Sequence, residues 1–157
     1  ALRTAGAEFG MGLFGARAVE SMRMEKGYRH WKADLITEFD PYESDLARFV
    51  RPNKPAFIGK DALAQRHANG PQKRFVSLRL DTTDAPAQPG ASVRTDGQVV
   101  GTITSADWGH RVGENLAMAF IDPQATTGLT VDILGQPVPA QEVAAARYDP
   151  ENTLVRS

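Results

Sequence analysis

The second half of the chain alternates apolar and polar positions in short runs, as β-strands with one buried face do. The run RFVSLRL puts Val76, Leu78 and Leu80 on one face and Phe75 and Ser77 on the other, because successive side chains of a strand point to opposite sides. The three aliphatic residues are therefore predicted to face a core.

Turn residues separate these runs. Asp96-Gly97 lies between residues 92–95 and residues 98–103, and this dipeptide favours a hairpin because both turn positions need positive φ. Further apolar runs lie at 115–121, 129–134 and 137–145. Five or more short strands predict that residues 72–157 form an all-β module, a sandwich or a barrel.

The first half mixes helical and irregular patterns. Residues 1–9 carry apolar side chains at helical spacing. The run FIGKDAL at 57–63 leads into a predicted helix with an acidic residue in its first turn, and this helix stops at Asn69-Gly70. Residues 27–40 are rich in aromatic and charged side chains and predict a loop.

Composition restricts the function classes. The 157 residues include no cysteine and carry a formal net charge of -1, so thiolate metal sites, disulfides and a global basic field for nucleic acid are excluded. The three histidines are far apart in sequence, which argues against a metal site, and no apolar run has the roughly 18 residues of a membrane span. A cytoplasmic protein is expected, without membrane or nucleic-acid partners. Because residue 1 is Ala1 and the opening helix is short, a fragment or processed product is expected.

The richest chemistry lies in residues 21–34, SMRMEKGYRHWKAD. The run SMRMEK alternates, which predicts a strand with Arg23 and Glu25 on one face. Arginine pairs with carboxylates, glutamate accepts hydrogen bonds from an amino-heterocycle, and Tyr28 or Trp31 can stack on a flat ring. A planar ligand with an anionic tail would suit this set. Alternatively, Arg23 and Glu25 form a surface pair while the aromatic residues pack a corner.

A catalytic triad of Ser105, Asp107 and His110 is not expected. The three residues lie in one short stretch after a predicted hairpin strand, whereas the members of a triad usually come from separate elements. Hydrogen bonding within a loop is the expected role.

Several motifs, taken in order, resemble the glycine-cleavage T-protein family, in particular dimethylglycine and sarcosine dehydrogenases. The run MRMEKGY with Trp31 and Asp34-Leu35 is similar to an arginine–apolar–glutamate segment of that family, and FIGKDAL at 57–63 is similar to its helix entry. The hairpin that carries Gly97, Val100-Gly101 and Thr104-Ser105 and the closing run 137–148 also match. Together these matches span essentially the whole chain.

The resemblance implies an α+β fold: the tail of a folate-binding domain followed by a small C-terminal all-β Greek-key barrel or sandwich. Residues 1–52 would end the folate-binding domain, 53–71 would form a connecting helix, and 72–157 would form the β-domain. The implied reaction transfers a one-carbon unit to tetrahydrofolate, with a methylated amine as the other substrate. The aspartate that assists this reaction lies upstream in the family, so this chain is expected to hold no catalytic residue and to show no turnover alone.

The resemblance also implies binding residues. Tyr28 falls where the family places an aromatic side chain against the folate, and Arg23, Glu25 and Trp31 lie in the same segment. Arg17 lies near a family arginine but is offset, and either Arg147 or Arg156 would be the C-terminal arginine that approaches folate in some members. FAD is expected only if a flavin domain lies upstream.

Two other functions stay open at this point. The chain could belong to a folate-dependent demethylase of another methylated substrate, or it could be a non-catalytic β-rich interaction module. A flavin domain in the full gene would separate dehydrogenase from demethylase, and tight binding of tetrahydrofolate would exclude the interaction module.

Overall fold

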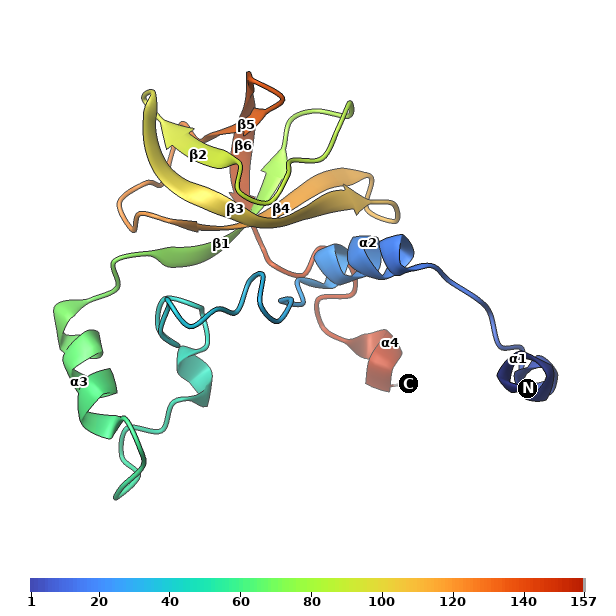
Figure 1. Cartoon of the computed structure of the whole chain (residues 1–157), viewed down its shortest axis with the longest axis horizontal. Coiled ribbons are helices and arrows are strands. Elements are labelled where there is room, and N and C mark those ends of the chain that lie inside the picture. The colour runs from blue at the N-terminus through green and yellow to red at the C-terminus, as the bar shows by residue number, and fades with distance from the viewer. Residues whose placement is uncertain (157) are drawn as a thin grey trace.

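A computed structural model describes residues 1–156, and its main body is a closed barrel of six antiparallel strands (Figure 1). The strands are β1 (Arg74–Leu80), β2 (Ser92–Thr95), β3 (Gln98–Gly109), β4 (Glu114–Ile121), β5 (Thr130–Ile133) and β6 (Gln136–Val143). They close in the order β1-β4-β3-β2-β5-β6. Since β1 lies beside β4, the last strand of the β2-β3-β4 meander, the barrel contains a Greek key. The expectation of a small Greek-key β-domain is confirmed, as a barrel.

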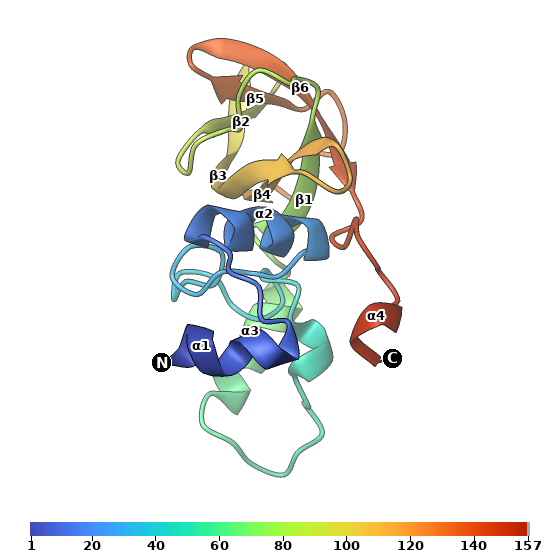
Figure 2. The same cartoon turned by 90° about the vertical axis from the view of Figure 1, so that its right-hand side faces the viewer.

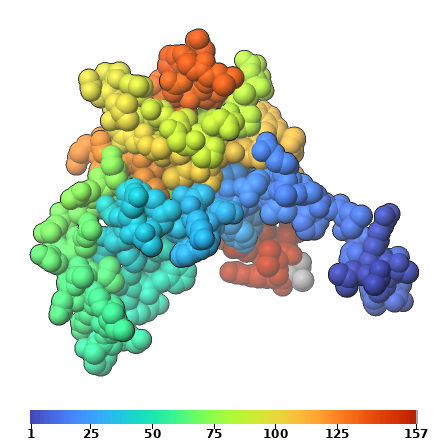
Figure 3. Space-filling model, viewed as in Figure 1, coloured from blue at the N-terminus to red at the C-terminus, as the bar shows by residue number. Residues whose placement is uncertain are grey.

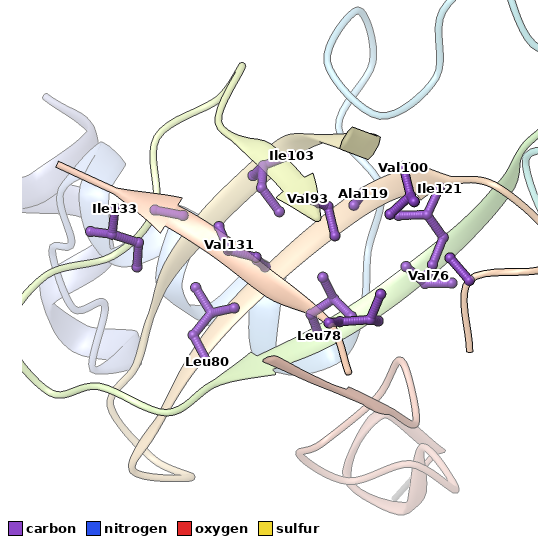
Figure 4. Packing of buried hydrophobic residues seen from close by; sticks show 14 residues of the cluster. Val76, Leu78, Leu80, Val93, Val100, Ile103, Ala119, Ile121, Val131 and Ile133 are labelled. Carbon is purple, nitrogen blue, oxygen red and sulfur yellow. The ribbon is translucent and has the colours of Figure 1, made fainter. Parts of the chain in front are cut away.

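The barrel is filled by side chains from alternate strand positions (Figure 4). On β1, Val76, Leu78 and Leu80 are buried in this core as predicted, whereas Ser77 points to the other face. The other labelled core residues are Val93, Val100, Ile103, Ala119, Ile121, Val131 and Ile133. Closure leaves no open sheet edge and keeps this core away from water.

A β-bulge interrupts β3 where it passes over β4. Ile103 pairs with Ala119 and Ser105 pairs with Met118, so Thr104 is the extra residue between them. A bulge bends its strand and redirects the side chain of the extra residue. Here it turns the Thr104 hydroxyl outward, toward the segment that packs on the barrel.

Short helices and the loops that connect them make up the rest of the described chain. The helices are α1 (Leu2–Gly6), η1 (Ala7–Phe9), α2 (Ala16–Lys26), η2 (Ala47–Phe49), α3 (Lys60–Asn69) and α4 (Thr153–Arg156). The predicted helix after FIGKDAL and its end at Asn69-Gly70 are confirmed by α3. None of the helices in the described part of the chain is long and apolar enough to cross a membrane.

The predicted strand at residues 21–26 is wrong, because these residues belong to α2. The buried residues of this helix are Ser21, Met24 and Glu25, which are spaced by three and four as on one helix face. Met22 is 41% exposed and Met24 only 2%, so the two methionines do not share a face. The alternation misled because six residues are too few to separate the two periods.

Helix α2 lies across the outside of the barrel, against β3 and β4 (Figure 2). Met24 packs there with Leu116 and Met118, and Phe75 and Val112 extend this small apolar cluster. Residues 1–9 project from the body as a separate lobe (Figure 3). The site residues therefore sit on a helix and a bend that are held by the barrel wall.

Candidate functional site

The bend after α2 begins at a glycine that no other residue could replace without strain. Gly27 has φ 66°, and the N–H of Tyr28 donates to the carbonyl of Arg23 (3.0 Å) across the helix end, as in a Schellman motif. A Cβ on Gly27 would lie 2.5 Å from the carbonyl oxygen of Ala145. The left-handed turn and the close C-terminal segment together fix where Tyr28 leaves the helix.

Asp34 holds the far end of the bend on the barrel. Its side chain is fully buried, and its Oδ2 accepts hydrogen bonds from the His30 N–H (2.7 Å) and from Arg23 Nη1 (3.0 Å). Its Oδ1 accepts one from the Thr104 hydroxyl (2.5 Å), the bulge residue of β3. One carboxylate thus joins α2, the bend and the barrel.

Nearly all N–H donors of the Arg23 guanidinium form hydrogen bonds within α2 and the bend. Its Nη1 donates to Asp34 and to the carbonyl of Tyr28 (2.8 Å). Its Nε and Nη2 donate to Glu20 Oε2 at 3.0 and 2.6 Å. Because these partners occupy most of its donors, Arg23 is built as a support for the bend rather than as a free anion receptor.

Glu25 is also a structural anchor. It is 1% exposed, and its Oε1 accepts hydrogen bonds from the N–H groups of Arg111 (2.5 Å) and Val112 (3.3 Å) in the β3–β4 turn. Its carbonyl accepts from the N–H groups of Arg147 and Tyr148. The alternative of an exposed pair of Arg23 and Glu25 on one strand face is therefore wrong: both are anchors on a helix, turned to different partners.

The aromatic side chains of the bend are open to solvent. Tyr28 is 55% exposed and Trp31 66%. Tyr28 lines a hollow of about 470 Å³, here called the Tyr28 hollow, between the bend and the C-terminal segment. The other residues that line it are Lys26, Gly27, Arg29, Leu35, Asp45, Leu46, Arg48, Ala145, Ala146, Pro150 and Asn152.

Arg23 lines a different hollow, of about 410 Å³, with Arg17 and Glu20 of α2 and with residues 86–89 and 104–107 of the barrel domain. Neither Glu25 nor Trp31 lines this hollow or the Tyr28 hollow. The structure therefore does not bring Tyr28, Arg23, Glu25 and Trp31 to one shared surface. Glu25 is kept from it because this residue lies on the face of α2 that is buried against the barrel.

The C-terminal segment is tied to the barrel by an ion pair. Arg147 Nε and Nη2 each donate to the Glu114 carboxylate at 2.7 Å. This hydrogen-bonded pairing lowers the pKa of Glu114 and raises the pKa of Arg147. Of the two candidate C-terminal arginines, Arg147 thus has an internal partner, while Arg156 lies exposed in α4.

The expected loop role of Ser105, Asp107 and His110 is wrong for the first two, which lie in β3. Asp107 Oδ1 accepts a hydrogen bond from the neighbouring Trp108 N–H, Ser105 lies buried on β3, and the His110 N–H lies 3.5 Å from Ser21 Oγ. Within residues 1–156, no group of three or more His, Cys, Asp or Glu side chains could hold a metal ion.

Three residues of this region were missed by sequence reasoning alone. They are Asp34, whose carboxylate joins α2, the bend and the barrel; Thr104, which donates to that carboxylate from β3; and Arg29, which lines the Tyr28 hollow. In the sequence, Asp34 stands out only as part of a motif. Nothing in the local pattern could have paired it with Thr104, which is 70 positions away.

Two protein-family models match the chain in the same order as these structural parts. The GCVT N-terminal domain matches residues 1–54, and the glycine cleavage T-protein C-terminal barrel domain matches residues 73–149. With the barrel and the packed helix described above, these matches define the class: the chain belongs to the glycine cleavage T-protein family.

Individual relatives agree with this assignment. Mitochondrial dimethylglycine dehydrogenase of Homo sapiens is 37% identical over 144 residues, which are 89% of this chain and 17% of that protein. The formaldehyde-forming 4-methylaminobutanoate oxidase of Paenarthrobacter nicotinovorans is 33% identical over 159 residues, which are 99% of this chain and 19% of that protein. This chain thus spans less than a fifth of either enzyme.

A solved structure shows the same fold. The glycine cleavage system aminomethyltransferase T from Bartonella henselae superposes with a TM-score of 0.78 at 21% identity, over 85% of this chain and 38% of that chain. This similarity shows that the chain has the same fold as the matched part of that aminomethyltransferase.

Proposed function

We propose that this chain works as the C-terminal portion of an enzyme that transfers a one-carbon unit from a methylated amine to tetrahydrofolate, of the aminomethyltransferase or dimethylglycine/sarcosine dehydrogenase type. The supporting observation is that two models of one family match successive parts of the chain, residues 1–54 and 73–149. In this proposal residues 1–52 end the folate-binding domain, 53–71 form the connecting helix and 72–157 the barrel domain. FAD would belong to the protein only if a flavin domain precedes this part.

The residues present suit one wall of a folate site. The Tyr28 hollow, at about 470 Å³, falls within the usual size range of small-molecule sites. The half-exposed ring of Tyr28 can stack against a flat heterocycle. In this proposal Arg23 and Glu25 hold the bend that presents Tyr28, and Trp31 belongs to the same bend but lies outside the hollow. Tetrahydrofolate would supply the nitrogen that accepts the one-carbon unit.

A titration of the ¹⁵N-labelled chain with tetrahydrofolate tests the proposal. We expect amide shifts concentrated at residues 27–31 and 145–152. Tyr28→Ala should weaken binding by about fivefold, because a stacked aromatic contact contributes on the order of 1 kcal/mol. Phe9→Ala, which removes an exposed ring from the separate N-terminal lobe, should leave binding unchanged. No shift at millimolar tetrahydrofolate, or equal effects of both variants, would overturn the folate site and favour a non-catalytic interaction module.

One observation favours a related alternative, a demethylase of another methylated substrate. The 4-methylaminobutanoate oxidase matches 99% of this chain, so a methylated amine other than dimethylglycine or sarcosine is a candidate. Comparing kcat/KM of the full gene product for dimethylglycine, sarcosine and 4-methylaminobutanoate would decide between them.

The cytoplasmic location stays a prediction, and the human dehydrogenase relative is named mitochondrial.

A further inference from the structure

We propose that the Tyr28 hollow contains a carboxylate-binding subsite whose central residue is Arg29. The inference rests on the proposed function and names the part of the ligand that this hollow would hold. Tetrahydrofolate carries carboxylates on its glutamate tail, and methylated amino acids carry one of their own. Carboxylate recognition is the chemistry that both sources share.

Arg29 is held in place on its inner side. Its guanidinium carbon lies 4.9 Å above the Phe75 ring centroid, and its side chain is only 13% exposed. A cation over an aromatic ring is attracted to the ring face. The planar group thus loses little further freedom when it binds an anion at its outer edge, which favours affinity.

The outer edge of Arg29 already binds a carboxylate of the chain itself. Its Nη2 donates to Asp45 Oδ2 at 2.5 Å, and the Asp45 side chain is 73% exposed. Among residues 1–156, Asp45 is the only group that accepts a side-chain hydrogen bond from Arg29. Exposed ion pairs contribute about 0–1 kcal/mol, so a ligand carboxylate could replace Asp45 at low cost.

The charge around this position also favours an anion. Lys26, Arg29 and Arg48 line the Tyr28 hollow, against the single carboxylate of Asp45. Lys26 is occupied by Asp149 and Asn152, but Arg48 interacts only with the neighbouring Phe49 ring through its side chain, among the described residues. An aromatic ring beside the guanidinium groups of Arg29 and Arg48 suits a ligand that joins a flat heterocycle to a carboxylate.

Three ligands test the inference on the labelled wild-type chain: tetrahydrofolate, the amide of tetrahydropteroate, which ends in a neutral amide and carries no carboxylate, and dimethylglycine. We expect tetrahydrofolate to bind about tenfold more tightly than the amide, the ratio expected of one charge-assisted hydrogen-bonded pair. The Nε–Hε resonance of Arg29 should move with tetrahydrofolate and stay unchanged with the amide. A purely structural arginine would not respond to the tail of the ligand.

Variants sharpen the test. Arg29→Gln should bring the affinity ratio of the two folates close to one, and Asp45→Asn should raise the affinity for tetrahydrofolate by removing the internal competitor. Arg79→Gln, on the outside of β1 with Gln141 as its partner, is the matched control and should change neither. If Arg29→Gln fails to fold, the wild-type resonance and the Asp45→Asn result still decide.

The outcomes separate the two proposals. Equal binding of both folates with an unmoved Arg29 resonance would overturn the subsite while the folate proposal stands. If dimethylglycine moves the Arg29 resonance and neither folate binds, the subsite stands with the methylated amino acid as its source, and the folate proposal fails. If none of the three ligands binds, both proposals are overturned.

Discussion

At the scale of single residues, the bend that presents Tyr28 depends on a few side chains with buried partners. Asp34 is fully buried and bound to Arg23, whereas Asp45 binds Arg29 from an exposed position. Both are ion pairs of an aspartate with an arginine, yet they differ in their contact with water. The degree of burial should therefore determine how much each ion pair contributes to the free energy of unfolding.

Asp34→Asn tests this difference. The substitution removes the buried carboxylate that accepts hydrogen bonds from Arg23, His30 and Thr104, so it should lower the free energy of unfolding by about 3 kcal/mol. Asp45→Asn should change it by less than about 1 kcal/mol, since the pair is exposed. Urea denaturation followed by circular dichroism measures both. Equal losses would show that Asp34 does not hold the bend.

Gly27 offers a second comparison between matched residues. Gly27 and Gly113 have nearly the same φ, 66° and 67°, but only at Gly27 would a Cβ meet other atoms. Gly113→Ala should cost about 1 kcal/mol for the left-handed conformation alone. Gly27→Ala should cost about 1–3 kcal/mol more, because the C-terminal segment at Ala145 has to move. Unfolding midpoints in urea that coincide for the two variants would contradict this contact.

At the scale of elements, the C-terminal segment joins the barrel to the end of α2. Arg147 pairs with Glu114 of β4, and Lys26 of α2 donates to the carbonyl and the carboxylate of Asp149. The pKa of Asp149 is lowered mainly by a hydrogen bond from the Thr153 side chain. The pKa of Glu114 is lowered mainly by the hydrogen-bonded Arg147. Both carboxylates therefore prefer the charged form in the folded chain.

This preference makes the attachment of the segment sensitive to acid. A carboxylate whose pKa is lower when folded stabilises the chain fully above its unfolded pKa and loses that effect as pH falls through the folded pKa. The ordinary pKa of Glu114 is 4.5. The stability difference between the wild type and Glu114→Gln should therefore be largest at neutral pH and shrink at pH values below the ordinary pKa. Urea unfolding at both pH values measures it, and a constant difference would contradict the ion pair.

At the scale of the whole molecule, the proposed site is one wall beside the barrel. The Tyr28 hollow is open, and exposed apolar residues such as Leu13 and Phe14 lie between the N-terminal lobe and α2. The relatives are longer enzymes, of which this chain spans less than a fifth in the dehydrogenase and oxidase cases. In the proposed function, the carboxylate that assists the chemistry lies outside these 157 residues.

The isolated chain should accordingly bind folate weakly and catalyse nothing. With dimethylglycine or sarcosine, an oxidant and tetrahydrofolate, we expect no methylene-tetrahydrofolate above the rate without protein. Product formation is measured by chromatography with mass detection. The full-length gene product under the same conditions is the positive control. Turnover by the isolated chain would show that its own residues suffice and would refute the proposal that the assisting carboxylate lies elsewhere.

The local sequence pattern determined the approximate positions of the barrel strands and of the helix that ends at Asn69, although β3 continues six residues beyond the predicted end at Ile103. A period of two repeats within five to seven residues, and turn residues such as Asp96-Gly97 mark the ends of strands through their own backbone preferences. These signals are carried by neighbours in the chain, so they are visible without the fold. The order of the motifs along the chain likewise indicated the family.

Only the tertiary structure decided what residues 21–34 do. The run SMRMEK fits either period, and α2 formed because the barrel wall buries the side chains of residues 21, 24 and 25. Asp34 acquired its role from Thr104, which a β-bulge turns toward it, and Glu25 from the turn at Arg111. Burial and hydrogen bonding depend on atoms brought together from distant parts of the chain, which a local pattern does not contain.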